Sequence, residues 1–303
     1  MDKITVAPKI IVYKNMLKNP KNTLDFLKST EAYTEKTGLF EPWRNWEANW
    51  FGKITEIMTD GVLYEINDFD DEELKKQKIV LNEIRNVYID VLNDYASIYK
   101  NDTDWPDFIK SWDNFPNEPW VYIKEIGILK YNSEQNEDMA NYPLAMHYHT
   151  DYNSSDAESR SSKLVITVTM YLNDDYEGGE ISLYDPNSNS VYNYKPKAGD
   201  VTVFPSGMNY YHGVLPFQGN NRYLIRMIML YYYEGSEKWL RNEKEYGPDL
   251  WKKMEKERLE KAYHDCINIT NIVLPGQTEQ NPNFKSIYVK KDPIYIDGTK
   301  NDK

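Results

Sequence analysis

The stretch from Asn141 to Arg226 constrains this chain more than any other, because it combines strand-like alternation with most of the histidines. Within it, the triplet His149-Thr150-Asp151 places an imidazole and a carboxylate two residues apart. On an extended strand, or at its end, both side chains then project from the same face. The sequence therefore predicts a pair of metal ligands at this point.

A second imidazole, His212, lies further along the same stretch. Two neutral imidazoles and one carboxylate leave about three octahedral positions open, as in non-haem Fe(II) sites that bind a cosubstrate and dioxygen. His147 shares the strand face of His149, so spacing alone nominates it too, but only His149 has a carboxylate two residues on. We therefore predict His149, Asp151 and His212 as ligands. His147 is either a contact beside the metal or an ordinary polar side chain.

Arg222 lies in the strand-like run from Asn221 to Arg226. A planar guanidinium matches a carboxylate at two points, so Arg222 is suited to the far carboxylate of a dicarboxylate whose other end chelates the metal. Arg226 lies on the same strand face and is the alternative for this role.

These residues, in this order, resemble the 2-oxoglutarate and Fe(II)-dependent dioxygenases of the prolyl 4-hydroxylase-like branch. The matching motifs are HTD, YLND with EGGE, PKAGD before VTVFPS, and HGVLP leading to Arg222. The resemblance implies Fe(II), 2-oxoglutarate as cosubstrate and O2, and it leaves room for ascorbate. It further implies that Tyr171 helps Arg222 to hold the cosubstrate. Tyr131 is a second such candidate, with plain packing as its alternative.

The implied reaction is hydroxylation of a C–H bond with release of succinate and CO2, and a peptidyl proline is the leading substrate. Met146 and Leu224 depart from the family pattern, so a free amino acid or another small metabolite is the alternative substrate. Two alternatives come from other classes. A zinc hydrolase would use the same three ligands, but Arg222 would then have no role in the reaction. The other alternative is a non-catalytic jelly-roll binding protein, and the intact ligand set argues against it.

Composition limits the partners. A net charge of −12 argues against nucleic acid, because phosphate binding needs a basic face. A peptide, protein or amino-acid-like substrate fits better. No apolar run approaches the roughly 20 residues that span a bilayer, so we expect no membrane partner. Cys266 is the single cysteine and no secretory signal is recognisable, which favours a cytoplasmic location. The sequence carries no signal for an oligomeric state.

Short strand-like runs separated by Gly and Pro turns predict a mainly β fold with flanking helices, closed as a jelly roll. The resemblance makes this core a cupin-like double-stranded β-helix. We expect an N-terminal strand and support helices over 1–116, including a helix from Asp70 to Lys100. The oxygenase core then covers 117–233, and a helical extension with a tail covers 234–303.

Three further features have weaker signals. The polar segment 152–162 is predicted to be a loop, as readily a lid over the substrate as a solvated connection. The aromatic segment from Gly38 to Gly52 is better explained by packing than as a wall of the substrate cleft. His264 and Cys266 are predicted to be structural.

Overall fold

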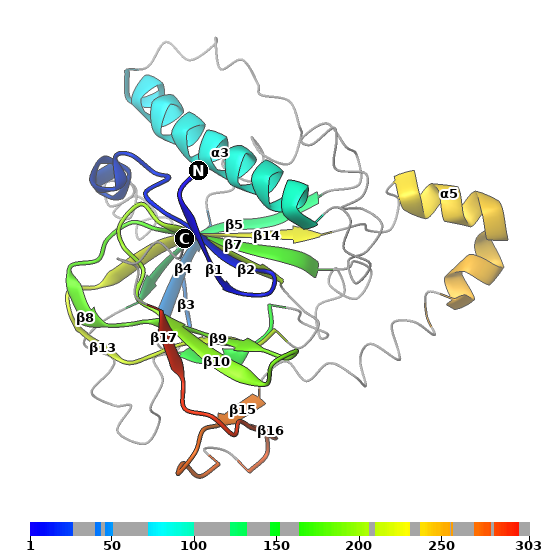
Figure 1. Cartoon of the computed structure of the whole chain (residues 1–303). Helices are drawn as coiled ribbons and strands as arrows, with labels where there is room; N and C mark the ends of the chain where they lie inside the picture. Colours follow the sequence, from blue (N-terminus) through cyan, green and yellow to red (C-terminus); the bar gives the residue numbers. More distant parts are fainter. Residues whose placement is uncertain are drawn as a thin grey trace.

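The computed structural model describes residues 1–26, 40–43, 46–50, 72–99, 122–131, 146–151, 164–205, 210–230, 237–254, 256, 270–279 and 282–296. Two sheets form its centre (Figure 1). The larger, 8-stranded sheet has the order β1 (Lys3–Ala7), β2 (Ile10–Tyr13), β11 (Val201–Pro205), β7 (Leu164–Tyr171), β14 (Arg222–Leu230), β5 (Tyr122–Tyr131), β4 (Trp46–Trp50) and β3 (Phe40–Trp43). The 5-stranded sheet has the order β17 (Ile294–Ile296), β10 (Ser190–Tyr194), β9 (Ile181–Asp185), β12 (His212–Val214) and β6 (Met146–His149).

The remaining elements are short strand pairs and helices. The pairs are β8 (Tyr176–Gly178) with β13 (Phe217–Gly219), and β15 (Thr270–Val273) with β16 (Lys285–Tyr288). The helices with described bounds are α3 (Glu72–Tyr99) and α5 (Glu237–Tyr246). Among the helices that the structure describes, none is long and apolar enough to cross a membrane.

The chain passes repeatedly between the two sheets. β5, β7, β11 and β14 belong to the larger sheet, whereas β6, β9, β10 and β12 belong to the smaller one. Apart from the β9–β10 pair, which stays in the smaller sheet, the chain therefore alternates between two facing layers, which is the jelly-roll arrangement. The predicted fold class, mainly β with flanking helices around a double-stranded β-helix, is confirmed.

Side-chain alternation shows which face of each strand lies between the sheets. In β2, Ile10 and Val12 pack with Leu183 of the smaller sheet, whereas Ile11 and Tyr13 pack on the opposite face with the residues of α3. Strand side chains point alternately to the two faces of a sheet, so both faces of β2 are covered. This explains why β2 is buried along its whole length.

The long helix predicted over residues 70–100 is confirmed as α3, which lies along the outer face of the larger sheet (Figure 1). Tyr88 and Tyr95 project from its buried side. The Tyr88 hydroxyl donates to the Ile225 carbonyl at 3.2 Å, and the Tyr95 hydroxyl donates to the Lys9 carbonyl at 2.8 Å. Burying each such side chain is worth about 1.5–3 kcal/mol, so α3 anchors the outer face of the strands that carry the site.

The segments flanking the core also join it. In the aromatic segment, β3 and β4 pair as antiparallel strands at the edge of the larger sheet, where Trp46 pairs with Tyr131 of β5. The side chains of β3 and β4 lie outside the described part. The C-terminal strands β15 and β16 cover Tyr148 and Tyr211 on the outer side of the smaller sheet. The tail therefore packs against the core.

Several predicted features fall outside the described part of the chain. They are the polar loop at 152–162, His264 and Cys266, and the side chains of His147 and Met146.

Candidate metal and cosubstrate site

Strand pairing in the smaller sheet brings two histidines together. His149 ends β6 and His212 begins β12, and the two are direct partners across the antiparallel pair. Their ring centroids lie 4.3 Å apart. The Phe204 ring, from β11 of the opposite sheet, packs 4.7 Å from the His212 ring and closes one side of the pair.

Asp151 completes the group just after β6. Its Oδ1 lies 3.8 Å from His149 Nε2, and its Oδ2 lies 3.6 Å from His212 Nε2. The ligand atoms of the three residues all lie within 4.8 Å of one another. Within the described ranges, this is the one cluster of three or more such groups that could hold a metal ion. The sequence predicted these three residues as ligands, and the fold brings them together.

The charge states of this group suit a divalent ion. Burial, followed by the charge of His149, lowers the pKa of His212 to about 3, so its imidazole is neutral at pH 7 and can donate a lone pair. Burial alone would raise the pKa of the Asp151 carboxyl. The neighbouring histidines and Arg226 outweigh burial and hold this pKa below its usual range. Two imidazoles and one carboxylate match the donor set of a non-haem Fe(II) site.

Arg226 and Thr167 contact Asp151 directly. Arg226 Nη1 lies 3.2 Å from Asp151 Oδ1, and Thr167 Oγ1 donates to Oδ2 at 2.5 Å. The sequence offered Arg226 only as an alternative to Arg222 in cosubstrate binding. Its contact instead lies at the metal end of the site.

Arg222 is the first residue of β14, four positions before Arg226, and is almost fully buried. It pairs in register with Tyr131 at the end of β5. The guanidinium carbon lies 4.9 Å from the Tyr131 ring centroid and 5.3 Å from the Tyr171 ring centroid. Among the described residues, Arg222 Nε and Nη1 have no hydrogen-bond partner. A buried guanidinium with unused donors is costly, and a bound carboxylate would satisfy it.

Tyr176 is a third tyrosine beside Arg222, and the sequence did not suggest it. It packs in one cluster with Tyr131, Tyr171 and Leu224. Burial raises the pKa of its hydroxyl, and the nearby Arg222 charge opposes that rise. Within the described part, no hydrogen bond of normal geometry satisfies this buried hydroxyl. The one available signal was its place between YLND and EGGE, in a short strand where period-two alternation cannot assign a face.

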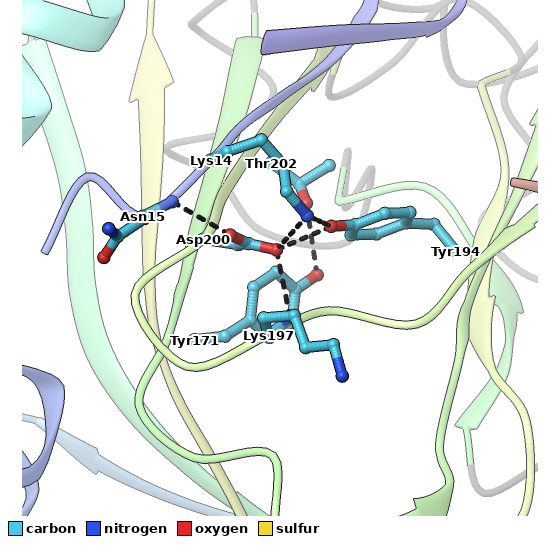
Figure 2. Close-up of polar contacts among 7 residues, drawn as sticks. All are labelled: Lys14, Asn15, Tyr171, Tyr194, Lys197, Asp200 and Thr202. Atoms are coloured by element: carbon cyan, nitrogen blue, oxygen red, sulfur yellow. Dashed lines mark hydrogen bonds and ion pairs between the residues drawn. The ribbon is translucent and has the colours of Figure 1, made fainter. Parts of the chain in front are cut away.

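The Tyr171 hydroxyl is fixed by two threonines from neighbouring strands. Thr169 Oγ1 donates to it at 3.1 Å. Thr202 Oγ1 lies 3.5 Å from the same hydroxyl oxygen (Figure 2). The main chain of Tyr171 is held as well, because its nitrogen donates to the Asp200 carbonyl and its carbonyl accepts from Gly199. The predicted cosubstrate tyrosine is therefore held rigidly in place.

Asp200 ties the turn beside Tyr171 to the N-terminal segment (Figure 2). Its carboxylate accepts from Lys14 Nζ at 2.9 Å, from the Tyr194 hydroxyl at 2.6 Å and from the Asn15 main-chain nitrogen at 3.0 Å. The neighbouring Gly199 has a φ of +90°, and a Cβ there would lie 2.6 Å from the Leu17 carbonyl oxygen. The PKAGD motif thus serves packing next to the site.

Comparison with known proteins agrees with this geometry. Residues 138–233 match the family model described as the 2OG-Fe(II) oxygenase superfamily. No curated protein matches the chain.

Several solved structures resemble this chain at low sequence identity. A prolyl hydroxylase from Trichoplax adhaerens, solved with a hypoxia inducible factor peptide, is 17% identical over 75% of this chain and 84% of that chain, with a TM-score of 0.42. A viral collagen prolyl hydroxylase from Paramecium Bursaria Chlorella virus-1 is 15% identical over 73% and 95%, with a TM-score of 0.40. The rice dioxygenase for auxin oxidation is 14% identical over 75% and 77%, with a TM-score of 0.46.

The matched segment contains the histidine–aspartate–histidine group and Arg222 on facing sheets of a jelly roll. Residues 138–233, which carry these side chains, therefore match the 2OG-Fe(II) oxygenase superfamily, whose members use Fe(II) and 2-oxoglutarate.

Proposed function

We propose that this protein is an Fe(II)- and 2-oxoglutarate-dependent dioxygenase that hydroxylates a C–H bond of a peptidyl proline or a related side chain. One observation carries the proposal: the metal-ligand group contacts Arg226 of β14, and on the same face of β14 lies buried Arg222, whose Nε and Nη1 have no hydrogen-bond partner among the described residues. Arg226, four residues beyond Arg222, contacts Asp151. Residues on a strand rise by about 3.3 Å, so the Cα atoms of these arginines lie about 13 Å apart. A small dicarboxylate can therefore reach from the metal ligands beside Arg226 to the guanidinium of Arg222.

In this proposal, His149, Asp151 and His212 hold Fe(II), and Arg222 holds the distal carboxylate of 2-oxoglutarate. When bound, the two cofactors supply the oxidising power, because decarboxylation of the keto acid to succinate and CO2 consumes one atom of O2 and leaves the other for the substrate. Asp151 favours hydroxylation over halogenation, since a small residue in its place would leave a metal position open to halide.

The surrounding side chains orient the cosubstrate and exclude water. Tyr131, Tyr171 and Tyr176 enclose the Arg222 guanidinium, and Leu224 gives the same pocket an apolar wall. In such a dry pocket a charge-assisted pair is stronger than in water. These residues would thus fix one orientation of 2-oxoglutarate, with its keto-acid end toward the metal.

The substrate class follows from the motif order, which resembles that of the prolyl 4-hydroxylase-like branch. The net charge of −12 would steer a basic peptide toward the protein, and it would add little to specificity. A free amino acid or small metabolite is the competing substrate, because Leu224 stands where some relatives carry a small hydroxyl residue.

The direct test of the substrate is a peptide library. Iron-loaded protein with 2-oxoglutarate and O2 is expected to add one oxygen atom to proline-containing peptides, detected by mass spectrometry, with one succinate formed per oxygen added. The same library without proline should give no product.

Free amino acids are run as the matched comparison. If they drive succinate formation while no peptide is oxidised, the peptide assignment is wrong and the oxygenase assignment stands. A His212→Ala sample in each series shows whether the product depends on the metal site.

A further inference from the structure

We propose that Arg226 and Thr167 are positioning residues that restrict Asp151 to giving the metal a single carboxylate oxygen. This inference rests on the proposed function for the identity of the cosubstrate, but its structural basis is independent of the substrate. It assigns a role to two side chains that the metal group and the Arg222 pocket do not use.

Side chains from two different strands contact the two oxygens of the Asp151 carboxylate. Arg226, on β14, approaches Oδ1 at 3.2 Å, and Thr167, on β7, donates to Oδ2 at 2.5 Å. The Asp151 side chain is only 2% exposed and the Arg226 side chain 10%. β7 and β14 are adjacent and central in the larger sheet, so the backbone that carries each partner is held by a paired strand on both sides.

A carboxylate without such contacts can rotate easily. The terminal torsion of an aspartate has a broad, two-fold distribution, so nothing local fixes the plane of its oxygens. Two hydrogen-bond donors on opposite oxygens do fix that plane. In other metal sites, contacts to the ligands from behind likewise set ligand orientation, and their loss weakens metal binding about 10- to 100-fold.

The two oxygens differ in what they can offer a cation. Oδ1 lies against a guanidinium, whose positive charge repels a second cation. Oδ2 receives its hydrogen bond from a neutral hydroxyl and lies 3.6 Å from His212 Nε2, whereas Oδ1 lies 3.8 Å from His149 Nε2. The geometry thus leaves Oδ2 for the metal and reserves Oδ1 for Arg226.

This restriction matters because the metal has few positions. Two imidazoles and one oxygen leave about three of six octahedral positions open, enough for a two-point cosubstrate and one further ligand. A carboxylate that bound through both oxygens would leave about two, and the cosubstrate would fill both. The clamp made by Arg226 and Thr167 therefore keeps one position open when 2-oxoglutarate is bound.

The test counts metal-bound water in Arg226→Met and Thr167→Val. Mn(II) is the probe, and the relaxation rate of solvent protons reports how many exchanging waters the ion carries. With saturating Mn(II) alone, the variants should lose about a third of the parent's enhancement, as three waters become two. After 2-oxoglutarate is added, the parent should keep one water and the variants close to none. Arg226→Lys, which restores a cation, should return toward the parent value.

Lys3→Met is the matched control, because it removes the cation of another aspartate pair, in which Lys3 Nζ lies 2.5 Å from Asp94 Oδ2. Its relaxation should equal that of the parent. A folded Arg226→Met protein that shows the parent's water count, or that binds no Mn(II) at all, overturns the proposal.

If Arg226→Met fails to fold by circular dichroism, Thr167→Val carries the same readings. If the parent Mn(II) protein binds no 2-oxoglutarate, the proposed function fails while the metal-only comparison still decides the role of the clamp.

Discussion

Replacing His212 by alanine is expected to weaken Fe(II) binding by more than about 100-fold, since loss of contacts behind a ligand already costs 10- to 100-fold. His212 is buried and neutral, and it pairs across the sheet with His149. Its removal takes away one of the three protein donors. His149→Ala should have the same effect.

Anaerobic Fe(II) titration of the two variants measures this loss. His264→Ala is the matched control, because it removes the histidine that the sequence places outside the metal group; it should bind iron like the parent. Far-ultraviolet circular dichroism should be unchanged in all three variants. Tight Fe(II) binding by either His212→Ala or His149→Ala would show that the ligand assignment is wrong.

Replacing Arg222 by alanine should weaken 2-oxoglutarate binding strongly while leaving Fe(II) binding intact. Truncating one partner of a buried charge pair costs about 2–5 kcal/mol, which is roughly 30-fold or more in affinity. Binding is measured by calorimetry on the Mn(II)-loaded protein, without O2. Far-ultraviolet circular dichroism should show that the variant keeps the fold of the parent.

Tyr176→Phe provides a graded comparison for Arg222→Ala. It removes only one hydroxyl from the same pocket, so the loss of 2-oxoglutarate affinity should be about tenfold, the value of one hydrogen bond to a charged group. Tyr288→Phe, on an exposed side chain of β16, should have no effect. An unchanged affinity in Arg222→Ala would contradict the assignment and direct attention to Arg226.

The metal group could be predicted from the sequence because its signal is local. The spacing of His149 and Asp151 predicts that their side chains share one face of a strand. The order of the later motifs predicts His212 as the third ligand and Arg222 as the cosubstrate contact. The long helix was equally clear, since α3 repeats its apolar residues at three and four positions. The crossing of strands between the two sheets needed the family resemblance, because periodicity does not say which strands pair.

The sequence was insufficient where a role depends on pairing across strands. It placed Arg226 on the face of Arg222 but could not show that Asp151 lies opposite it. Thr167 alternates correctly in β7, yet a threonine is an ordinary strand residue and carries no signal of its own. Strand β1 was not predicted, and the β3–β4 hairpin was not recognised because Pro42 and clustered tryptophans interrupt any alternation.

The most direct test of the central claim, that one site binds iron and 2-oxoglutarate for oxidation, is succinate release from isotopically labelled 2-oxoglutarate. Parent protein loaded with Fe(II) should form labelled succinate and CO2 in air. It should form neither without O2, and His212→Ala should form neither under any condition. Zinc-loaded protein should be inactive. Absence of succinate from a parent protein that demonstrably binds Fe(II) and is supplied with O2, 2-oxoglutarate and the peptide and amino-acid substrates would contradict the account.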